Sequence, residues 1–162
     1  MHKLIATFCY CGYLRPAPGT WGSLAGLIVA YPIMVYSGSV GLIIACGLAY
    51  ALGLWATKEM TKGQADHDPS EIVIDEVAGI WLALLPVASG AEMMGVDYSA
   101  LWPGWIAAFA LFRLFDITKP WLVGWADRMD NATGVMLDDV IAGIFAAIGV
   151  MVLATLAHLV LM

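Results

Sequence analysis

The sequence has few charged residues, and this shortage indicates its class. Only 12% of its 162 residues are Asp, Glu, Lys or Arg, whereas 62% are hydrophobic, and the mean hydropathy is +0.85. A soluble domain carries about 25% charged residues, so the composition excludes an ordinary water-soluble enzyme and predicts an integral membrane protein. At this length we expect residues 1–162 to form a single all-α domain, a polytopic membrane helical bundle.

Cations and cysteines are also scarce. Seven Lys and Arg stand against thirteen Asp and Glu, which gives a formal net charge of −6 at pH 7. Nucleic-acid binding requires a basic face, so we expect no nucleic-acid partner. The three cysteines, Cys9, Cys11 and Cys46, are an odd number in apolar surroundings and form no C-x-x-C motif. Neither a disulfide framework nor a cysteine-ligated metal is therefore expected.

The start of the chain lacks the signature of a cleavable leader. Lys3 precedes an apolar stretch over 4–14, but Arg15 and Pro16 follow directly, without a small-residue cleavage site. Eleven apolar residues are also too few to cross a bilayer. This stretch predicts a short interfacial or re-entrant helix that stays with the chain.

Uncharged runs predict about five membrane crossings. No charge occurs between Arg15 and Lys58, an interval that fits two spans, and the sequence SGSVG at 37–41 provides turn residues between them. A kink is expected in the third span at Pro86. The predicted spans cover about 21–36, 40–57, 77–91, 98–112 and 140 onward.

The third and fourth runs are too short to cross a bilayer alone. Each has fifteen residues, or about 22 Å of helix at about 1.5 Å per residue, against a hydrocarbon core of roughly 30 Å. We therefore expect their helices to continue into the neighbouring charged segments. Charges would then lie at the membrane interface and face protein or water.

Every basic residue falls on one predicted side of the membrane. With five crossings, the segments before the first span, between the second and third, and between the fourth and fifth share a side. The positive-inside rule assigns that side to the cytoplasm. The basic residues are Lys3, Arg15, Lys58, Lys62, Arg113, Lys119 and Arg128.

Eleven of the thirteen acids lie on the same side, and two segments there repeat one pattern. The sequences IVIDEVAGIW at 72–81 and VMLDDVIAGI at 135–144 each place two adjacent acids before a small-residue stretch. Neighbouring helix positions point about 100° apart, so one acid of each pair can face a shared centre. The four acids are Asp75, Glu76, Asp138 and Asp139.

A glycine follows each acid pair, and it allows close packing of two helices. Gly79 and Gly143 occupy matching positions in the two segments. A simpler interpretation is that the acids only stabilise helix N-termini through the helix dipole. Two such pairs in a chain with so few acids favour a shared site.

Two further segments carry groups suited to phosphate. In FRLFDITKPW at 112–121, Arg113, Asp116 and Lys119 recur every three residues along one side of a helix. They form either a stabilising ion-pair ladder or a site with two phosphate donors and one further carboxylate. In RPAPGTWGS at 15–23, a rigid loop leads into a helix N-terminus, which is either a simple cap or an anion site.

The ligands expected at such a site are oxygen atoms, which favour a hard cation, Mg²⁺ before Zn²⁺. The sequence DHDPS at 66–70 adds Asp68 and His67 as groups for proton transfer. Signatures of other hydrolases are missing, since the chain has no G-x-S-x-G motif and no G-x-x-x-x-G-K motif.

Together these segments resemble the phosphatidylglycerophosphatase A family, Mg²⁺-dependent membrane phosphatases of bacteria. Four ordered motifs carry the resemblance: PGTWGSLAG at 18–26, HDPSEIVIDEVAGIW at 67–81, FRLFDITKPW at 112–121 and DRMDNATGVMLDDVIAG at 127–143. The resemblance implies a helical bundle around a buried central helix. It also implies hydrolysis of phosphatidylglycerol phosphate, a phospholipid, to phosphatidylglycerol, in the bacterial inner membrane with an active site facing the cytoplasm.

The chemistry of the side chains suggests individual roles. We expect one or two Mg²⁺ ions to be bound by the metal ligands Asp75, Glu76, Asp138, Asp139 and Asp116, which with Asp68 form the catalytic set. For the substrate phosphate we expect contacts from Arg113, Lys119, Gly19, Thr20 and Ser23. The nucleophile, either an aspartate or a metal-bound water, and the oligomeric state do not follow from the sequence.

Two other functions remain open at this point. A phosphatase of another lipid phosphate would use the same groups, because headgroup selectivity is not readable from them. An ion-coupled transporter would place ionisable residues near the centres of its spans, whereas here they gather at one end.

Overall fold

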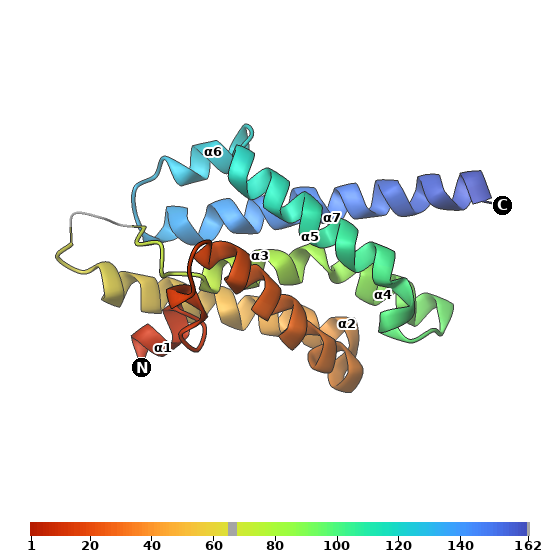
Figure 1. Ribbon diagram of the computed structural model, residues 1–162, viewed down its shortest axis with the longest axis horizontal. Coiled ribbons are helices and arrows are strands. Elements are labelled where there is room, and N and C mark those ends of the chain that lie inside the picture. Colours follow the sequence, from red (N-terminus) through yellow and green to blue (C-terminus); the bar gives the residue numbers. More distant parts are fainter. Residues whose placement is uncertain (65–67, 162) are drawn as a thin grey trace.

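The computed structural model of the protein describes residues 1–64 and 68–161, and these residues are helical with no strand. Four helical stretches are long and apolar enough to cross a membrane: Pro18–Thr61, Ile74–Met94, Tyr98–Thr118 and Ala132–Val160. Figure 1 shows them as one elongated bundle. The predicted all-α membrane bundle is confirmed. In chain order the elements are α1 (His2–Ala6), η1 (Cys11–Tyr13), α2 (Pro18–Thr61), α3 (Ile74–Ala83), α4 (Leu85–Met94), η2 (Tyr98–Leu101), α5 (Trp102–Thr118), α6 (Leu122–Asp127) and α7 (Ala132–Leu161).

Helix α2 reverses direction at Gly38, so its two halves correspond to two of the five predicted crossings. Gly38 has φ 64° and ψ −167°, which is not helical, and Figure 1 shows the chain turning back there. Glu92 of α4 receives hydrogen bonds from the backbone N–H of Ser39 (2.5 Å) and from its hydroxyl group (2.6 Å). The carboxylate therefore satisfies the free N-terminus of the second half, within the turn expected at 37–41.

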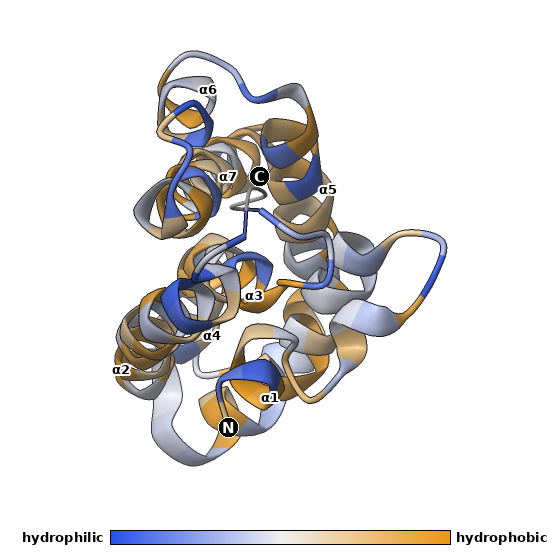
Figure 2. Cartoon of the chain, turned by 90° about the vertical axis from the view of Figure 1, so that its left-hand side faces the viewer, coloured by the Kyte–Doolittle hydropathy of each residue, from blue (hydrophilic) through white to orange (hydrophobic). Residues whose placement is uncertain are grey.

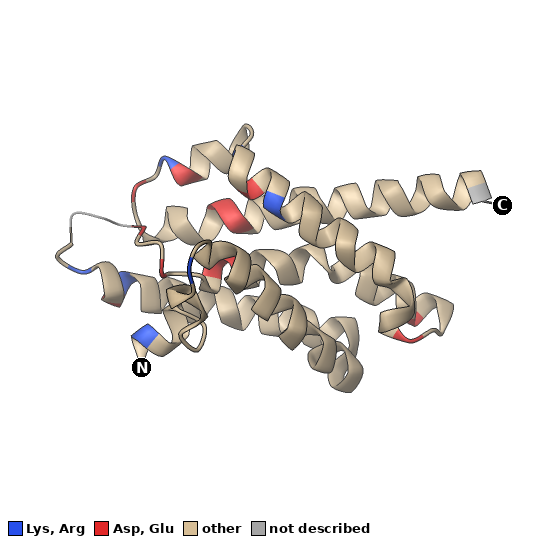
Figure 3. Cartoon of the chain, viewed as in Figure 1, with Lys and Arg blue, Asp and Glu red and all other residues tan. Residues whose placement is uncertain are grey.

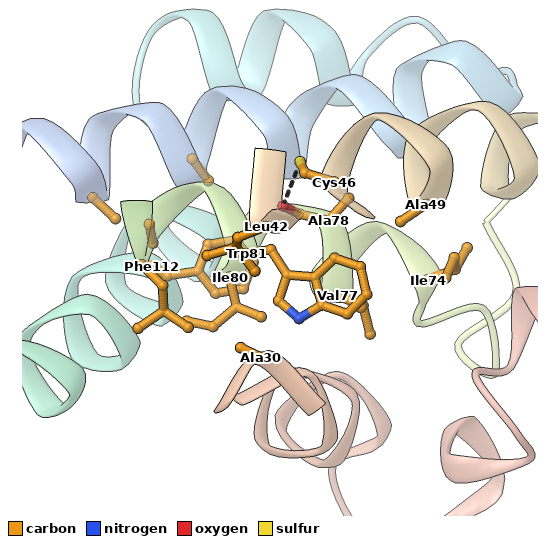
Figure 4. Packing of buried hydrophobic residues seen from close by; sticks show 14 of the residues in the cluster. Ala30, Leu42, Cys46, Ala49, Ile74, Val77, Ala78, Ile80, Trp81 and Phe112 are labelled. Atoms are coloured by element: carbon orange, nitrogen blue, oxygen red, sulfur yellow. Dashed lines mark hydrogen bonds between the residues drawn. The ribbon is translucent and has the colours of Figure 1, made fainter. Parts of the chain in front are cut away.

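Helix α3 is the buried central helix that the family resemblance implies. In Figure 2, viewed from the end where α3 begins, it lies among α2, α5 and α7, the three helices against which it packs most. The Trp81 indole donates a hydrogen bond to the Gly26 carbonyl of α2 (2.8 Å), and the Cys46 thiol donates one to the Ala78 carbonyl (3.4 Å; Figure 4). The expected kink in this crossing is a break between α3 and α4, two residues before Pro86.

The start of the last helix differs from the prediction. Helix α7 begins at Ala132, not at 140, because the Asn131 side chain accepts hydrogen bonds from the N–H groups of Thr133 and Gly134 and caps the helix. Asp138 and Asp139 therefore lie inside the helix. The third and fourth crossings extend into the charged segments, as expected. The N-terminal helix α1 is only five residues long, and it ends where Phe8, Cys9 and Tyr10 take left-handed conformations.

Helices α3 and α7 meet at their matching glycines. A Cβ atom on Gly143 would collide with the Gly79 carbonyl oxygen, and one on Gly79 would collide with the Phe112 ring and come within 2.7 Å of the Asp139 carbonyl oxygen. The two backbones are thus in direct contact, as the sequence pattern predicted.

Substitution of Gly143 by Ala should therefore destabilise the protein. The added methyl group has no space against the α3 backbone, and overpacking of this kind costs about 1–3 kcal/mol of unfolding free energy. Gly47→Ala is the matched control, since a Cβ at Gly47 meets nothing within 4 Å and gains helix propensity. Thermal unfolding in detergent measures both variants; equal melting temperatures would contradict the close contact.

Candidate active site

A cavity of about 330 Å³ lies where the first turns of α2 and α3 meet the last turns of α5 and the second turn of α7. Its lining is strongly charged, whereas most residues of α2–α7 are apolar. In Figure 3, Lys and Arg lie only toward this end of the molecule, and the charged residues at the opposite end are all acidic. The lining residues are Ala17, Pro18, Gly19, Asp68, Ser70, Ile72, Asp75, Glu76, Arg113, Asp116, Ile117, Lys119, Asp138 and Asp139.

The glycine contact between α3 and α7 brings their acids together. Asp75 precedes Gly79 by four residues, and Asp139 precedes Gly143 by four, so each acid lies one turn before the contact on the same helix face. Carboxylate oxygens of Asp75, Glu76 and Asp139 all lie within 4.8 Å of one another. Asp75 and Asp139 are buried, with exposed fractions of 6% and 3%.

This acid cluster, Asp75, Glu76 and Asp139, suits a hard divalent cation. Buried carboxylates so close together repel one another, and a cation removes that repulsion. The Glu76 Oε2 atom is buried and has no hydrogen-bond partner among the described residues, which leaves it available as a ligand. All the donor atoms are carboxylate oxygens, the type that Mg²⁺ prefers.

The other two acids expected to bind metal are each paired with a cation. Asp138 accepts a hydrogen bond from the Lys119 ammonium group (3.0 Å), and Asp116 forms an ion pair with Arg113 (2.6 Å). Both acids line the same cavity as the cluster. The structure thus separates the five predicted ligands into a group of three and two ion-paired acids.

Lys119 connects the end of α5 to α6 and α7. It ends α5 in a left-handed conformation (φ 43°), and its ammonium group contacts both Asp138 and Asp127. Partial burial opposes the charge, but hydrogen bonds and attraction from the two aspartates outweigh it and raise the Lys119 pKa above its ordinary value. Lys119 therefore stays protonated throughout the physiological pH range. Asp127 was not predicted, although it lies eight residues after Lys119 in the DRMD sequence.

Arg113 is held in place from two sides. Its Nη1 atom contacts Asp116 and donates a hydrogen bond to the Ser23 hydroxyl group (3.5 Å), which in turn donates to the Gly19 carbonyl (2.8 Å). The Arg113 Nε–H is buried and has no partner among the described residues. The guanidinium group is thus oriented in the cavity while it keeps donors for an anion.

The first turn of α2 supplies backbone rather than hydroxyl groups. Gly19 lines the cavity, whereas Thr20 and Ser23 do not, and Ser23 is fully buried behind Arg113. The first backbone N–H groups of this helix have no acceptors within the helix, so they are suited to bind an anion.

Asp68 lies on the exposed side of the same cavity, beside Ser70. Ser70 was not predicted; its hydroxyl group accepts a hydrogen bond from Arg15 (3.3 Å). His67, the second group considered for proton transfer, lies outside the described residues.

Comparisons with known proteins identify a family for the chain. Residues 4–154 match the family model described as phosphatidylglycerophosphatase A. A protein named phosphatidylglycerophosphatase A from Haemophilus influenzae is 37% identical over 90% of this chain and 83% of its own length. An Escherichia coli protein of the same name is 33% identical over 80% of this chain and 70% of its own.

One relative carries a different name. A putative phosphatidylinositol-3-phosphatase from Bacteroides thetaiotaomicron is 34% identical over 90% of this chain and 88% of its own length. No solved structure matches the chain significantly.

Proposed function

Because this chain belongs to the phosphatidylglycerophosphatase A family, we propose that it hydrolyses the terminal phosphate of phosphatidylglycerol phosphate to give phosphatidylglycerol. The observation that carries the proposal is the acid cluster beside Arg113 and Lys119 in one cavity. Phosphate monoesters are among the slowest compounds to hydrolyse without a catalyst. The acids and the two cations together can neutralise the negative charge of the phosphate and activate the attacking nucleophile.

We propose that Asp75, Glu76 and Asp139 hold Mg²⁺, with Asp116 and Asp138 as neighbouring carboxylates. When bound, the ion would neutralise phosphate charge and supply an acidic water. The free Glu76 Oε2 atom and the oxygen-only donor set support this assignment.

The remaining cavity residues bind the substrate phosphate and transfer a proton during hydrolysis. Arg113 donates two parallel hydrogen bonds to phosphate oxygens, a geometry that its planar guanidinium group favours. Lys119 adds a second positive charge, and the Gly19 backbone N–H contributes a neutral donor. Asp68, at the open side of the cavity, takes a proton from the attacking water and passes it to the lipid alcohol oxygen as the bond between that oxygen and phosphorus breaks.

The site is proposed to face the cytoplasm of the bacterial inner membrane. All seven Lys and Arg residues belong to segments at the cavity end of the bundle, and only Glu92 and Asp97 are charged at the other end. Basic loops are retained in the cytoplasm. A lipid anchored by its acyl chains would then present its headgroup phosphate at the depth of the cavity.

The test is release of inorganic phosphate from phosphatidylglycerol phosphate by the purified protein in detergent, with and without Mg²⁺. Mg²⁺-dependent release is expected. The Bacteroides relative favours a second candidate, a phosphatase of another phosphorylated lipid, so phosphatidylinositol 3-phosphate is assayed in parallel. Faster release from that lipid would replace the first candidate by the second.

Mg²⁺ should also stabilise the folded protein. A ligand that binds only the folded state at about a hundred times its Kd adds about 2.7 kcal/mol, which raises the melting temperature of a chain this long by several degrees. Asp75→Asn should remove most of that shift, whereas Asp97→Asn, at the opposite end, should keep it. An equal shift in both variants would mean that the ion binds elsewhere.

A further inference from the structure

A second concave surface lies between α2 and α5, far from the charged cavity along both helices. It is an apolar groove of about 340 Å³ with no polar lining surface. The groove is open to the surroundings of the bundle, since Ile28 and Trp102 are 74% and 64% exposed. Its lining residues are Leu27, Ile28, Tyr31, Ser99, Trp102 and Trp105.

Continuous helix faces connect this groove to the charged cavity. On α2, Ala17 lines the cavity, and steps of three or four residues lead through Thr20 and Leu24 to Ile28 and Tyr31. One face of α2 therefore runs from the cavity to the groove, and we call the strip between residues 17–31 and residues 102–117 the seam.

The same relation holds on α5. Trp105 lines the groove, and steps of four residues lead through Phe109 to Arg113 and Ile117, which line the cavity. Ile117, which lines the cavity at the end of this face, is 68% exposed. The polar end of the seam thus holds the phosphate donors, and the far end is apolar.

The length and the aromatic end of the seam fit an acyl chain. At about 1.5 Å per residue, Leu27 and Tyr31 lie about 12 and 18 Å beyond Gly19 along α2. The acyl chains of one leaflet fill about half of a roughly 30 Å core, or about 15 Å. Within the groove, the Tyr31 and Trp105 rings lie with centroids 6.2 Å apart, so aromatic side chains from both helices meet at this depth.

We infer that one acyl chain of the phospholipid substrate lies in the seam between α2 and α5, with its end in the apolar groove and its headgroup phosphate in the charged cavity. The inference rests on the proposed lipid phosphatase activity and assigns the groove to substrate binding. Contacts remote from the reacting phosphate then position it, so that chain binding contributes to the rate.

The test compares two forms of phosphatidylglycerol phosphate, one with palmitoyl chains and one with butanoyl chains too short to reach the groove. Ile28→Trp fills the groove, and Ile44→Trp is the matched control, an exposed isoleucine on the other half of α2. The measured quantity is the ratio of kcat/KM for the long-chain substrate to that for the short-chain substrate. Ile28→Trp should lower this ratio at least fivefold, and Ile44→Trp should leave it unchanged.

Trp102→Ala provides a second variant that removes apolar contact without adding bulk, and it should also lower the ratio. A ratio unchanged in both groove variants would overturn the inference. Equal losses on both substrates together with a changed oligomer size would also overturn it, because a second copy of the chain would then occupy the groove. If the wild-type protein releases phosphate from neither substrate, the proposed function fails, and the inference fails with it.

Discussion

Replacement of Asp139 by Asn is expected to reduce Mg²⁺-dependent phosphate release about 10³-fold, or about 4 kcal/mol of transition-state stabilisation. Asn has nearly the same shape, so the α3–α7 contact can persist, but the charge and one anionic ligand are lost. Asp139 is 3% exposed and belongs to the acid cluster with Asp75 and Glu76. No second acid of α7 replaces it, because Asp138 is paired with Lys119.

The measurement is phosphate release by purified variants at saturating Mg²⁺, with folding checked by size exclusion and thermal unfolding. Asp97→Asn is the control, since Asp97 lies at the opposite end of the bundle, where hydrogen bonds from Ser99 lower its pKa. Its activity should stay within about twofold of wild type. Retention of more than a tenth of the activity by the folded Asp139→Asn protein would exclude Asp139 as a metal ligand.

The approximate site was predictable because charge is so rare in this chain. Each ionisable group inside an apolar bundle has a large desolvation cost, so repeated acid pairs before a glycine stand out from the sequence. The spacing of four residues from Asp75 to Gly79 and from Asp139 to Gly143 determines how the two acids are placed relative to each other. Two parallel helices in contact at the glycines must bring those acids to one level.

The division of the acids was not predictable from spacing alone. Asp138 and Asp139 are adjacent, and which of them faces α3 depends on the rotation of α7 relative to its neighbours. That rotation follows from the Gly143 contact, which directs Asp139 inward and leaves Asp138 beside Lys119. Asp127 ends the short helix α6, which packs against α7, and it pairs with Lys119 eight residues earlier; no residue pattern in the sequence indicated this pair.

The start of α7 has a local capping signal in the sequence, which a prediction from hydropathy alone misses. The run without charges begins at Val140, whereas the helix begins eight residues earlier, after the Asn131 cap. Charged and polar residues in the first turns are tolerated because they face the cavity or the membrane interface. Capping chemistry therefore locates this helix start better than apolar length does.

Replacement of Gly19 by Ala is expected to reduce phosphate release about 10²-fold with little loss of stability. A Cβ at Gly19 would overlap the Glu76 Oε1 atom and lie 3.2 Å from the Arg113 Nη1 atom. The methyl group would therefore displace a proposed metal ligand and press on the phosphate donor held by Ser23 and Asp116. A displacement of about 1 Å in such a site can cost about 10² in rate.

The same substitution at Gly47 controls for helix propensity, because that glycine lies on the same helix with nothing within 4 Å of its added Cβ. Gly47→Ala should keep full activity and gain slightly in stability. Assays across a range of Mg²⁺ concentrations separate the two effects expected at Gly19: a higher Mg²⁺ requirement reports the displaced Glu76, and a lower maximal rate at saturating Mg²⁺ reports the displaced Arg113. A Gly19→Ala protein with wild-type rate and Mg²⁺ requirement would show that α2 does not approach the reacting phosphate, and the first turn of α2 would then serve only to begin the helix.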